Sequence, residues 1–244
     1  MNERDRRANA LLDVFSRWQD CEKCPLHETR TQIVFPDGNP SADIVVIGIS
    51  PGEDEDADGA PFVGDSGFVL EDYCKEVKVR KNDMFYMNIV SCRPFSTTRD
   101  SFGKKRTENR EPSLIERAAC RPLWEEALYI VDPLLVIAMG KSAIQEITGQ
   151  RSINMHQIQG KVKSCTIQGR AKSIVYPVLC MYHPSHLMRS GDIFKGGPWH
   201  QTLVAWQRAI YFVDRMRNLY WGEEMPERPF TTKDLSATMG SLPE

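Results

Sequence analysis

Three loops of the sequence gather side chains that could do chemistry, and each follows a short apolar run. They are residues 48–56 (GISPGEDED), 88–94 (NIVSCRP) and 182–187 (YHPSHL). An imidazole can donate or move a proton, an amide can both donate and accept hydrogen bonds, and a carboxylate can position water. Any one of these loops could be an ordinary turn. Three of them at strand ends predict an active site.

The cysteines form a second set of reactive side chains. Cys21 and Cys24 make a C-x-x-C pair, Cys92 follows an apolar run, and Cys120 lies in an expected helix. Four thiolates suit zinc or an iron–sulfur cluster, and the spacing does not choose between them. The pair alone could also cycle a disulfide or have no role. Three other cysteines have apolar neighbours and are expected in the core as small hydrophobic residues: Cys74, Cys165 and Cys180.

Four apolar runs of strand length carry these loops. They are residues 43–49 (DIVVIGI), 84–90 (MFYMNIV), 134–139 (LLVIAM) and 173–180 (SIVYPVLC). None alternates cleanly between apolar and polar residues, which is typical of strands buried on both faces of a parallel sheet.

Helical patterns separate the runs, at residues 66–76, 112–131, 141–148 and 199–220, and the first 20 residues are also expected to be helical. In the clearest helix, Ser113 and Glu116 form a capping box and Pro133 stops the helix. Alternating strands and helices predict an α/β fold whose parallel sheet is covered on both faces. The three loops then meet beyond the carboxyl ends of the strands, where such sheets bind ligands.

Two segments interrupt this pattern. Residues 96–109 (STTRDSFGKKRTEN) are polar and basic, and we expect a loop there. Residues 222–244 contain three prolines and few apolar side chains, which indicates a loosely ordered end. We therefore predict a single domain over residues 1–217 and a C-terminal tail over residues 218–244.

Composition and charge restrict the function further. The 244 residues carry a formal net charge of -2, so a nucleic-acid partner would require the basic residues to gather on one face. No apolar run approaches the ~20 residues that cross a bilayer, and the first residues lack a signal-peptide core. We expect a cytoplasmic monomer that does not bind membranes. Seven cysteines in a reducing compartment argue against a disulfide framework and favour a metal site.

Taken together and in order, the motifs resemble the family-four uracil-DNA glycosylases, the iron–sulfur type. The resemblance covers about residues 18–210. It rests on Cys21-x-x-Cys24-Pro25-Leu26, Arg30-Thr31, Gly48-x-x-Pro51-Gly52-x-x-Glu55-Asp56, Gly59-x-Pro61-Phe62-Val63-Gly64-x-x-Gly67, Asn88-x-x-x-Cys92-Arg93-Pro94, Asn109-Arg110-x-Pro112, Glu116-x-x-x-Cys120 and His183-Pro184-x-x-Leu187-x-Arg189.

The resemblance implies a fold, a cofactor and a reaction. The fold would be a three-layer α/β/α sandwich around a four-stranded parallel sheet. Cys21, Cys24, Cys92 and Cys120 would hold a 4Fe-4S cluster with a structural role. The reaction would be hydrolysis of the N-glycosidic bond of a flipped-out uracil, in single- or double-stranded DNA, leaving an abasic site.

The resemblance also implies roles for particular residues. Phe62 would stack on the flipped base and Asn88 would bind its Watson–Crick edge. His183 would donate to a uracil carbonyl oxygen as negative charge builds on the departing base. Leu187 would wedge into the gap in the base stack, and Arg189 would contact the DNA. The remaining base-site residues belong to the first loop, whose backbone amides could face the base or a phosphate: Gly48, Ile49, Pro51 and Gly52.

The first departure from the family pattern is Ile49, which stands where the family usually has a glutamate. An isoleucine cannot polarise water. An acidic run follows it, and we expect Glu55 or Glu53 to position water or to stabilise an oxocarbenium-like sugar. The less favoured alternative is a solvated turn with capping carboxylates. Ile49 also leaves open a slower enzyme or one that acts on another base.

The second departure is the segment between Pro94 and Asn109, which the family normally keeps very short. A related branch that becomes covalently tethered to DNA has a longer basic loop there, ending in a nucleophilic histidine at the position of Asn109. Asparagine is a poor nucleophile, so we expect no covalent trapping. Lys105, Arg106 and Asn109 could contact DNA, or the segment could be a merely exposed charged loop.

Three alternatives accompany the uracil hypothesis. The enzyme could excise another modified or damaged base, the protein could be a non-catalytic DNA-binding or damage-sensing relative, or it could be a zinc-stabilised nucleotide hydrolase. Asn88 and His183 together argue against the pure binding protein, because binding needs no group that stabilises a departing base.

Overall fold

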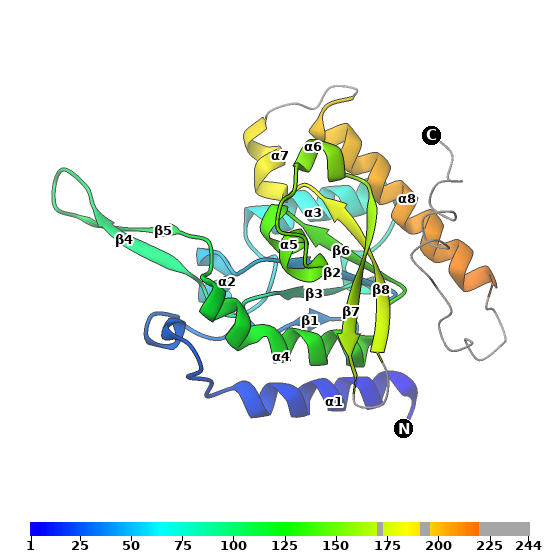
Figure 1. Cartoon of the computed structure of the whole chain (residues 1–244), viewed down its shortest axis with the longest axis horizontal. Helices are drawn as coiled ribbons and strands as arrows, with labels where there is room; N and C mark the ends of the chain where they lie inside the picture. The colour runs from blue at the N-terminus through cyan, green and yellow to red at the C-terminus, as the bar shows by residue number, and fades with distance from the viewer. Residues whose placement is uncertain (170–172, 191–195, 220–244) are drawn as a thin grey trace.

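Six strands form the central sheet of the computed structural model, which describes residues 1–169, 173–190 and 196–219 (Figure 1). Four parallel strands lie side by side in the order β3 (Phe85–Asn88), β2 (Ile44–Gly48), β6 (Leu135–Met139) and β8 (Ser173–Met181). At the two edges, β1 (Asp37–Gly38) pairs antiparallel with β3, and β7 (Val162–Gln168) pairs antiparallel with β8.

The prediction of a four-stranded parallel sheet is confirmed for the centre of the sheet and wrong for its edges. The four apolar runs are the four parallel strands. The sequence analysis did not predict β7. Its C-terminal half alternates between buried and exposed side chains, with Cys165 and Ile167 buried and Thr166 and Gln168 exposed. That period-2 pattern is typical of a half-buried edge strand. β1 is only two residues long and carries no such pattern.

Alternating side chains of the strands divide the core into two layers. In β2, Val45 and Ile47 pack into one layer, and Ile44 and Val46 pack into the other. The first layer contains α4 (Leu114–Val131) and α5 (Lys141–Thr148), and α1 (Glu3–Trp18) packs against α4. The second contains α3 (Asp65–Glu76), α7 (Pro184–Ser190) and α8 (Pro198–Leu219). The predicted three-layer sandwich is confirmed.

Helix α4 begins as its sequence predicts. The Ser113 hydroxyl accepts from the Glu116 amide, and the Glu116 carboxylate accepts from the Ser113 amide at 2.6 Å. Arg110 also binds the Glu116 carboxylate, at 2.7 and 2.9 Å, and this holds the Glu116 pKa below its usual range. The ion pair fixes the start of the helix that carries Cys120.

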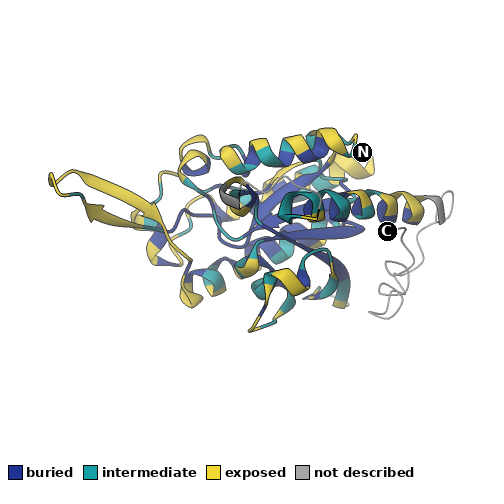
Figure 2. Cartoon of the chain, turned by 90° about the horizontal axis from the view of Figure 1, so that it is seen from above, coloured by how far each residue is buried: buried dark blue, intermediate teal, exposed yellow. Residues whose placement is uncertain are grey.

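The expectation of a loop over residues 96–109 is wrong. The segment is a hairpin of β4 (Phe95–Arg99) and β5 (Lys105–Asn109) that projects away from the sandwich, with nearly every side chain exposed (Figure 2). Hydrophobic patterning could not reveal these strands because neither has a buried face. Three threonines in the strands favour extended backbone, and Gly103, at φ +77°, supplies the left-handed residue in the turn.

Four short helices complete the described chain: η1 (Pro25–Glu28), α2 (Glu53–Asp58), η2 (Lys81–Asp83) and α6 (Met155–Ile158). The acidic run after β2 is therefore a helix and not a turn. No helix in the described ranges is long and apolar enough to span a membrane. Most of the predicted tail, residues 220–244, lies outside the described residues, so the domain boundary at 217 stays a prediction.

Strand order determines where a ligand can bind. The chain passes from β2 to β3 on one side of β2 and then crosses to β6 on its other side. A crevice opens beyond the carboxyl ends of parallel strands where the connections diverge in this way. Gly48 ends β2, Asn88 ends β3, and His183 follows β8, so all three lie at this edge.

Candidate active site

A cavity of about 460 Å³ opens at this carboxyl edge of the sheet. We call it the carboxyl-edge cavity. Its wall contains most of the residues predicted to touch the base, together with others that the sequence did not single out. The lining residues are Ile49, Ser50, Pro51, Gly52, Glu55, Phe62, Ser66, Asn88, Asn109, Arg110, Glu111, His183 and Ser185. The structure thus brings together residues from four separate segments of the chain.

Asn88 is held at the end of β3 beside Gly48, its register partner in β2. The side chain is 6% exposed, and its carboxamide makes no hydrogen bond with any described residue. A Cβ atom on Gly48 would lie 2.5 Å from Asn88 Oδ1 and 3.2 Å from Phe62 Cζ. Glycine at position 48 therefore leaves room for both side chains, and the amide keeps its donors and acceptor for a ligand.

Phe62 forms another wall in a strained conformation. Its φ is +56°, a region that non-glycine residues seldom adopt, and its ring packs against Tyr86 at 5.7 Å between centroids. Lys81 Nζ donates to the Phe62 carbonyl oxygen at 2.8 Å. A Cβ atom on Gly67 would lie 1.9 Å from the same oxygen. These close contacts fix the backbone of Phe62, and its ring packs against Tyr86.

His183 lies two residues after the end of β8, and its ring orientation is set locally. The Ser185 backbone amide donates to His183 Nδ1 at 3.2 Å. An amide can only donate, so Nδ1 is the acceptor in this contact, and the Ser185 hydroxyl lies 2.9 Å from the same nitrogen. In a neutral ring this arrangement places the proton on Nε2. Gly140, just past β6, leaves room for the His183 side chain, because a Cβ atom at position 140 would lie 3.1 Å from His183 Cβ.

The two acidic candidates differ in position. Glu55 lines the cavity, where its carboxylate accepts from the Gly52 amide at 2.9 Å and from the Gly64 amide at 3.2 Å. Each oxygen retains one lone pair beyond these bonds. Glu53 is largely exposed outside the lining and pairs with Arg93 at 3.0 Å. Ile49 is half-buried in the wall and also packs against the core.

Arg93 anchors one side of the cavity, a role that sequence reasoning missed. It is 6% exposed and donates from Nε to Asn109 Oδ1 at 2.7 Å. This bond attaches the end of the hairpin to the cavity wall. The only signal was the position of Arg93 directly after Cys92 in a strand-end loop; its partner lies 16 residues further along the chain. Ser185 was also missed, although it follows His183 by two residues.

The expected DNA-contacting residues lie outside the cavity, except for Asn109. Leu187 is buried within α7, in the core layer that includes α8. Lys105 and Arg106 are exposed on β5. Arg189 belongs to α7, but its side chain lies outside the described residues.

The four cysteines expected at a metal centre lie near one another, with Cys120 in α4 and Cys92 in the loop after β3. Cys24, Cys92 and Cys120 are buried in one core cluster and Cys21 is half-buried. The pKa of Cys92 is raised to about 11 and that of Cys120 to about 12, mainly by burial and to a smaller extent by charge on the neighbouring cysteines. Arg30 donates to Cys92 Sγ at 3.5 Å. Cys74, Cys165 and Cys180 are buried, as predicted.

Among the described residues, no three His, Cys, Asp or Glu side chains are grouped as ligands of one ion. In a 4Fe-4S cluster each of the four cysteines binds a different iron, so the four sulfurs lie further apart than the ligands of one ion. Thiols that hold such a cluster need not converge on one point.

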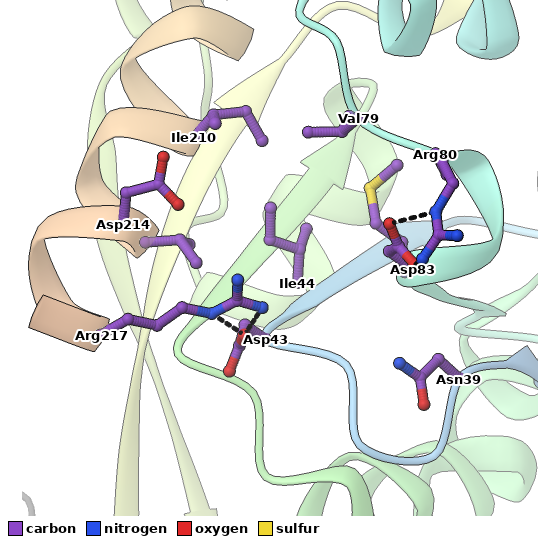
Figure 3. Close-up of a pocket in the computed structure, with 11 residues that line it drawn as sticks. Asn39, Asp43, Ile44, Val79, Arg80, Asp83, Ile210, Asp214 and Arg217 are labelled. Atoms are coloured by element: carbon purple, nitrogen blue, oxygen red, sulfur yellow. Dashed lines mark hydrogen bonds and ion pairs between the residues drawn. The ribbon is translucent and has the colours of Figure 1, made fainter. Parts of the chain in front are cut away.

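A second cavity, of about 300 Å³, lies at the amino ends of the parallel strands, opposite the carboxyl-edge cavity (Figure 3). It is near the start of β2 and beside α8. We call it the amino-edge cavity. Arg217 pairs with Asp43 there, and Arg80 pairs with Asp83 at 2.7 Å. Its charged side chains thus largely neutralise one another.

Comparison with known proteins agrees with the geometry of the carboxyl edge. The sequence model of the Uracil DNA glycosylase superfamily matches residues 35–204. The chain is 32% identical over 181 residues to the type-4 uracil-DNA glycosylase of Thermotoga maritima, which is 74% of this chain and 84% of that protein. It is 33% identical to the type-4 enzyme of Pyrobaculum aerophilum, over 70% of this chain and 81% of that protein. The chain belongs to the uracil-DNA glycosylase superfamily and, within it, to the type-4 uracil-DNA glycosylases.

Proposed function

We propose that this protein hydrolyses the N-glycosidic bond between deoxyribose and uracil in DNA, releasing the base and leaving an abasic site. The observation that carries the proposal is the meeting of Asn88, Phe62 and His183 around one cavity. An amide, an aromatic ring and a neutral imidazole are the groups needed to bind a flipped pyrimidine and to stabilise it as it leaves.

Asn88 would select uracil over cytosine. Uracil presents a carbonyl oxygen and an N–H group on its Watson–Crick edge, and one carboxamide can donate to the first and accept from the second. Cytosine has an amino donor in place of that oxygen and lacks that N–H group. Because Asn88 is buried at the end of β3, it cannot easily turn to suit cytosine, and a mismatched amide would be left unpaired.

His183 would stabilise the departing base. As the glycosidic bond breaks, negative charge develops on the uracil carbonyl oxygens. The neutral imidazole has its proton on Nε2, because Nδ1 accepts from Ser185. A hydrogen bond from Nε2 would therefore strengthen as the charge builds, which lowers the barrier more than it improves binding of the intact substrate.

A carboxylate would support the sugar or the attacking water. Glu55 is favoured over Glu53, because Glu55 lines the cavity while Glu53 lies outside the lining and pairs with Arg93. Its bonds to Gly52 and Gly64 fix the carboxylate but leave lone pairs for water or for interaction with an oxocarbenium-like sugar. Ile49 supplies no such group.

DNA would bind across the cavity mouth. We propose contacts from Lys105 and Asn109 on the hairpin and from Arg189 on α7, whereas a contact from Arg106, which pairs with Asp100 at 3.6 Å, stays a prediction. A wedge role for Leu187 stays a prediction, and it requires a rearrangement of α7, because this side chain is buried without DNA. A cytoplasmic location and a monomeric state also stay predictions.

We propose that Cys21, Cys24, Cys92 and Cys120 hold a 4Fe-4S cluster. Burial alone makes thiolates costly in this region, and the positive charge of bound iron would offset that cost. When bound, the cluster would brace the N-terminal segment against β3 and α4 without entering the reaction. Visible absorbance near 400 nm together with stoichiometric iron would support the cluster, whereas zinc without visible absorbance would contradict it.

The test is release of free base from single-stranded oligonucleotides with one central uracil, thymine or cytosine, scored by alkaline cleavage at the abasic site. Release from the uracil substrate alone supports the proposal. Because Ile49 lines the cavity in place of a glutamate, the second candidate is excision of another modified or damaged base. Protein with intact metal content that binds DNA but releases no uracil would favour that candidate, and a panel of damaged bases would then be tested.

A further inference from the structure

The β4–β5 hairpin has two faces of different character. Residues directly opposite each other on paired antiparallel strands share a face, and the face alternates along each strand. One face, which we call the near face, consists of Phe95, Thr97, Arg99, Lys105, Thr107 and Asn109. The other, the far face, consists of Ser96, Thr98, Arg106 and Glu108.

The near face continues the wall of the carboxyl-edge cavity. Asn109 lines the cavity itself. Arg93 donates to Asn109 Oδ1 at 2.7 Å and to Thr107 Oγ1 at 3.2 Å, and its guanidinium carbon lies 4.9 Å from the centroid of the Phe95 ring. One buried arginine therefore binds three near-face side chains and fixes the orientation of this face relative to the cavity.

Positive charge on the near face has no acidic partner in the described part of the chain, although Arg99 Nη1 donates to the Gly103 carbonyl oxygen at 3.0 Å. Arg99 and Lys105 lie directly opposite each other, and neither forms an ion pair within the described part of the chain. Like charges in this arrangement repel and destabilise a hairpin unless an anion lies between or beside them. On the far face Arg106 pairs with Asp100 at 3.6 Å, and Glu108 lies on the same face.

The hairpin is also ordered in advance of any partner. Asp100 Oδ1 accepts from the Phe102 amide at 3.0 Å and from the Lys104 amide at 2.9 Å, which closes the turn around Gly103. A preformed arm loses little conformational entropy on binding, so weak charged contacts along it can still contribute to affinity.

We propose that the near face binds backbone phosphates of the DNA strand that carries the flipped nucleotide, through Arg99 and Lys105. Arg106, although adjacent in sequence, contributes less because it lies on the far face and is paired. The inference rests on the proposed function, which places a DNA strand at the cavity, and it deepens that function by assigning the strand's path along one side of the hairpin.

Salt-dependent binding tests this assignment. Fluorescence anisotropy would measure the affinity of the full-length protein for a labelled single-stranded thymine oligonucleotide, which it is not expected to cleave, between about 50 and 200 mM salt. Each lost phosphate contact lowers the slope of log affinity against log salt by about 0.7 on single strands. We expect this loss for Arg99→Ala and for Lys105→Ala, with affinity about fivefold lower at the low-salt end, and about twice the slope change for the double variant.

Arg106→Ala is the matched control, because it removes the same charge from the same hairpin. We expect a clearly smaller change in slope than for Lys105→Ala. Equal changes, or a larger one for Arg106→Ala, would overturn the assignment. Uracil release by the wild-type protein distinguishes failure of the proposed function from failure of the near-face assignment. If the wild type releases no uracil, the proposed function fails. If it releases uracil but Lys105→Ala and Arg106→Ala change the slope equally, only the near-face assignment is contradicted.

Discussion

The two cavities at opposite edges of the sheet differ in what their polar groups already bind. In the amino-edge cavity, arginines and aspartates pair with each other, and none of its lining residues is an aromatic ring, an imidazole or a buried unpaired amide (Figure 3). In the carboxyl-edge cavity, a buried carboxamide has no partner among the described residues, and an aromatic ring is held in a strained conformation beside it. The carboxyl-edge cavity therefore presents a buried amide to a ligand, whereas both arginines and two of the three aspartates that line the amino-edge cavity are already paired.

This difference shows why volume alone identifies neither site. Folding tends to satisfy buried polar groups within the chain, and unsatisfied groups cost free energy. A group that stays unsatisfied in a rigid wall is therefore informative about a ligand. If only the carboxyl-edge cavity binds the substrate, substitutions there should affect uracil release far more than substitutions in the amino-edge cavity.

Replacing His183 by alanine has the largest expected effect. Loss of one donor to developing negative charge should lower the single-turnover rate of uracil release about 10²- to 10³-fold. DNA affinity should change much less, and anisotropy with an uncleaved oligonucleotide measures that separately. An equal loss of affinity and rate would make His183 a DNA contact and would weaken the case for the carboxyl edge as the reaction centre.

Asn88→Asp follows in magnitude. A carboxylate cannot donate to a uracil carbonyl oxygen, and the loss of one good hydrogen bond with repulsion should lower kcat/KM on uracil about 10- to 100-fold. The variant is nearly isosteric, so thermal unfolding should report a folded protein. Unchanged kcat/KM would exclude Asn88 from base recognition.

Gly67→Ala tests the strained wall. A Cβ atom 1.9 Å from the Phe62 carbonyl oxygen forces the backbone of one of the two residues to move. We expect a loss of about 1–3 kcal/mol in the free energy of unfolding, measured by denaturant titration, together with slower uracil release. The control is Ala60→Gly, a nearby substitution that adds no atoms. Gly103→Ala cannot serve as the control, because the positive φ of Gly103 would itself strain an alanine.

Ile49→Glu would sharpen the comparison by adding a carboxylate to the carboxyl-edge cavity. If water positioning limits the rate, uracil release should rise up to about tenfold, a modest part of what general-base assistance can supply. The rate is read from single-turnover assays at one pH. No change would mean that the family glutamate is dispensable in this chain and that Glu55 suffices.

Asp43→Ala is expected to have the smallest effect on activity. It breaks the partly exposed pair with Arg217 at the amino edge, which should cost at most about 1 kcal/mol of stability. Uracil release should stay within about twofold of the wild type. A loss comparable to that of His183→Ala would show that the amino edge contributes to the reaction.

Sequence reasoning worked where local pattern and topology agree. The buried parallel strands are continuous apolar runs, and strands of a parallel sheet present their following loops at one edge, so Asn88 and His183 could be expected to meet. Phe62 was expected beside them only from the family resemblance. The hairpin could not be predicted in the same way, because its strands bury no face and leave no hydrophobic period. Arg93 was missed because its role depends on a hydrogen bond to Asn109. Asn109 lies beside Arg93 only because β5 of the hairpin brings the chain back to the cavity.

The carboxylate role was the least predictable part of the site. Four acids in a row carry no information about which one lines a cavity. Helix α2 decides this, because it turns Glu55 toward Gly52 and Gly64 and leaves Glu53 beside Arg93. Those contacts depend on the angle at which α2 leaves β2, which sequence periodicity does not encode.

The most direct test of the central claim is a side-by-side measurement of uracil release by the wild type, His183→Ala and Asp43→Ala on the same single-stranded oligonucleotide under single-turnover conditions. We predict release by the wild type and by Asp43→Ala at similar rates, with His183→Ala slower by at least about 10²-fold. No release by cluster-loaded wild-type protein, or equal rates for wild type and His183→Ala, would contradict the assignment of uracil excision to the carboxyl-edge cavity.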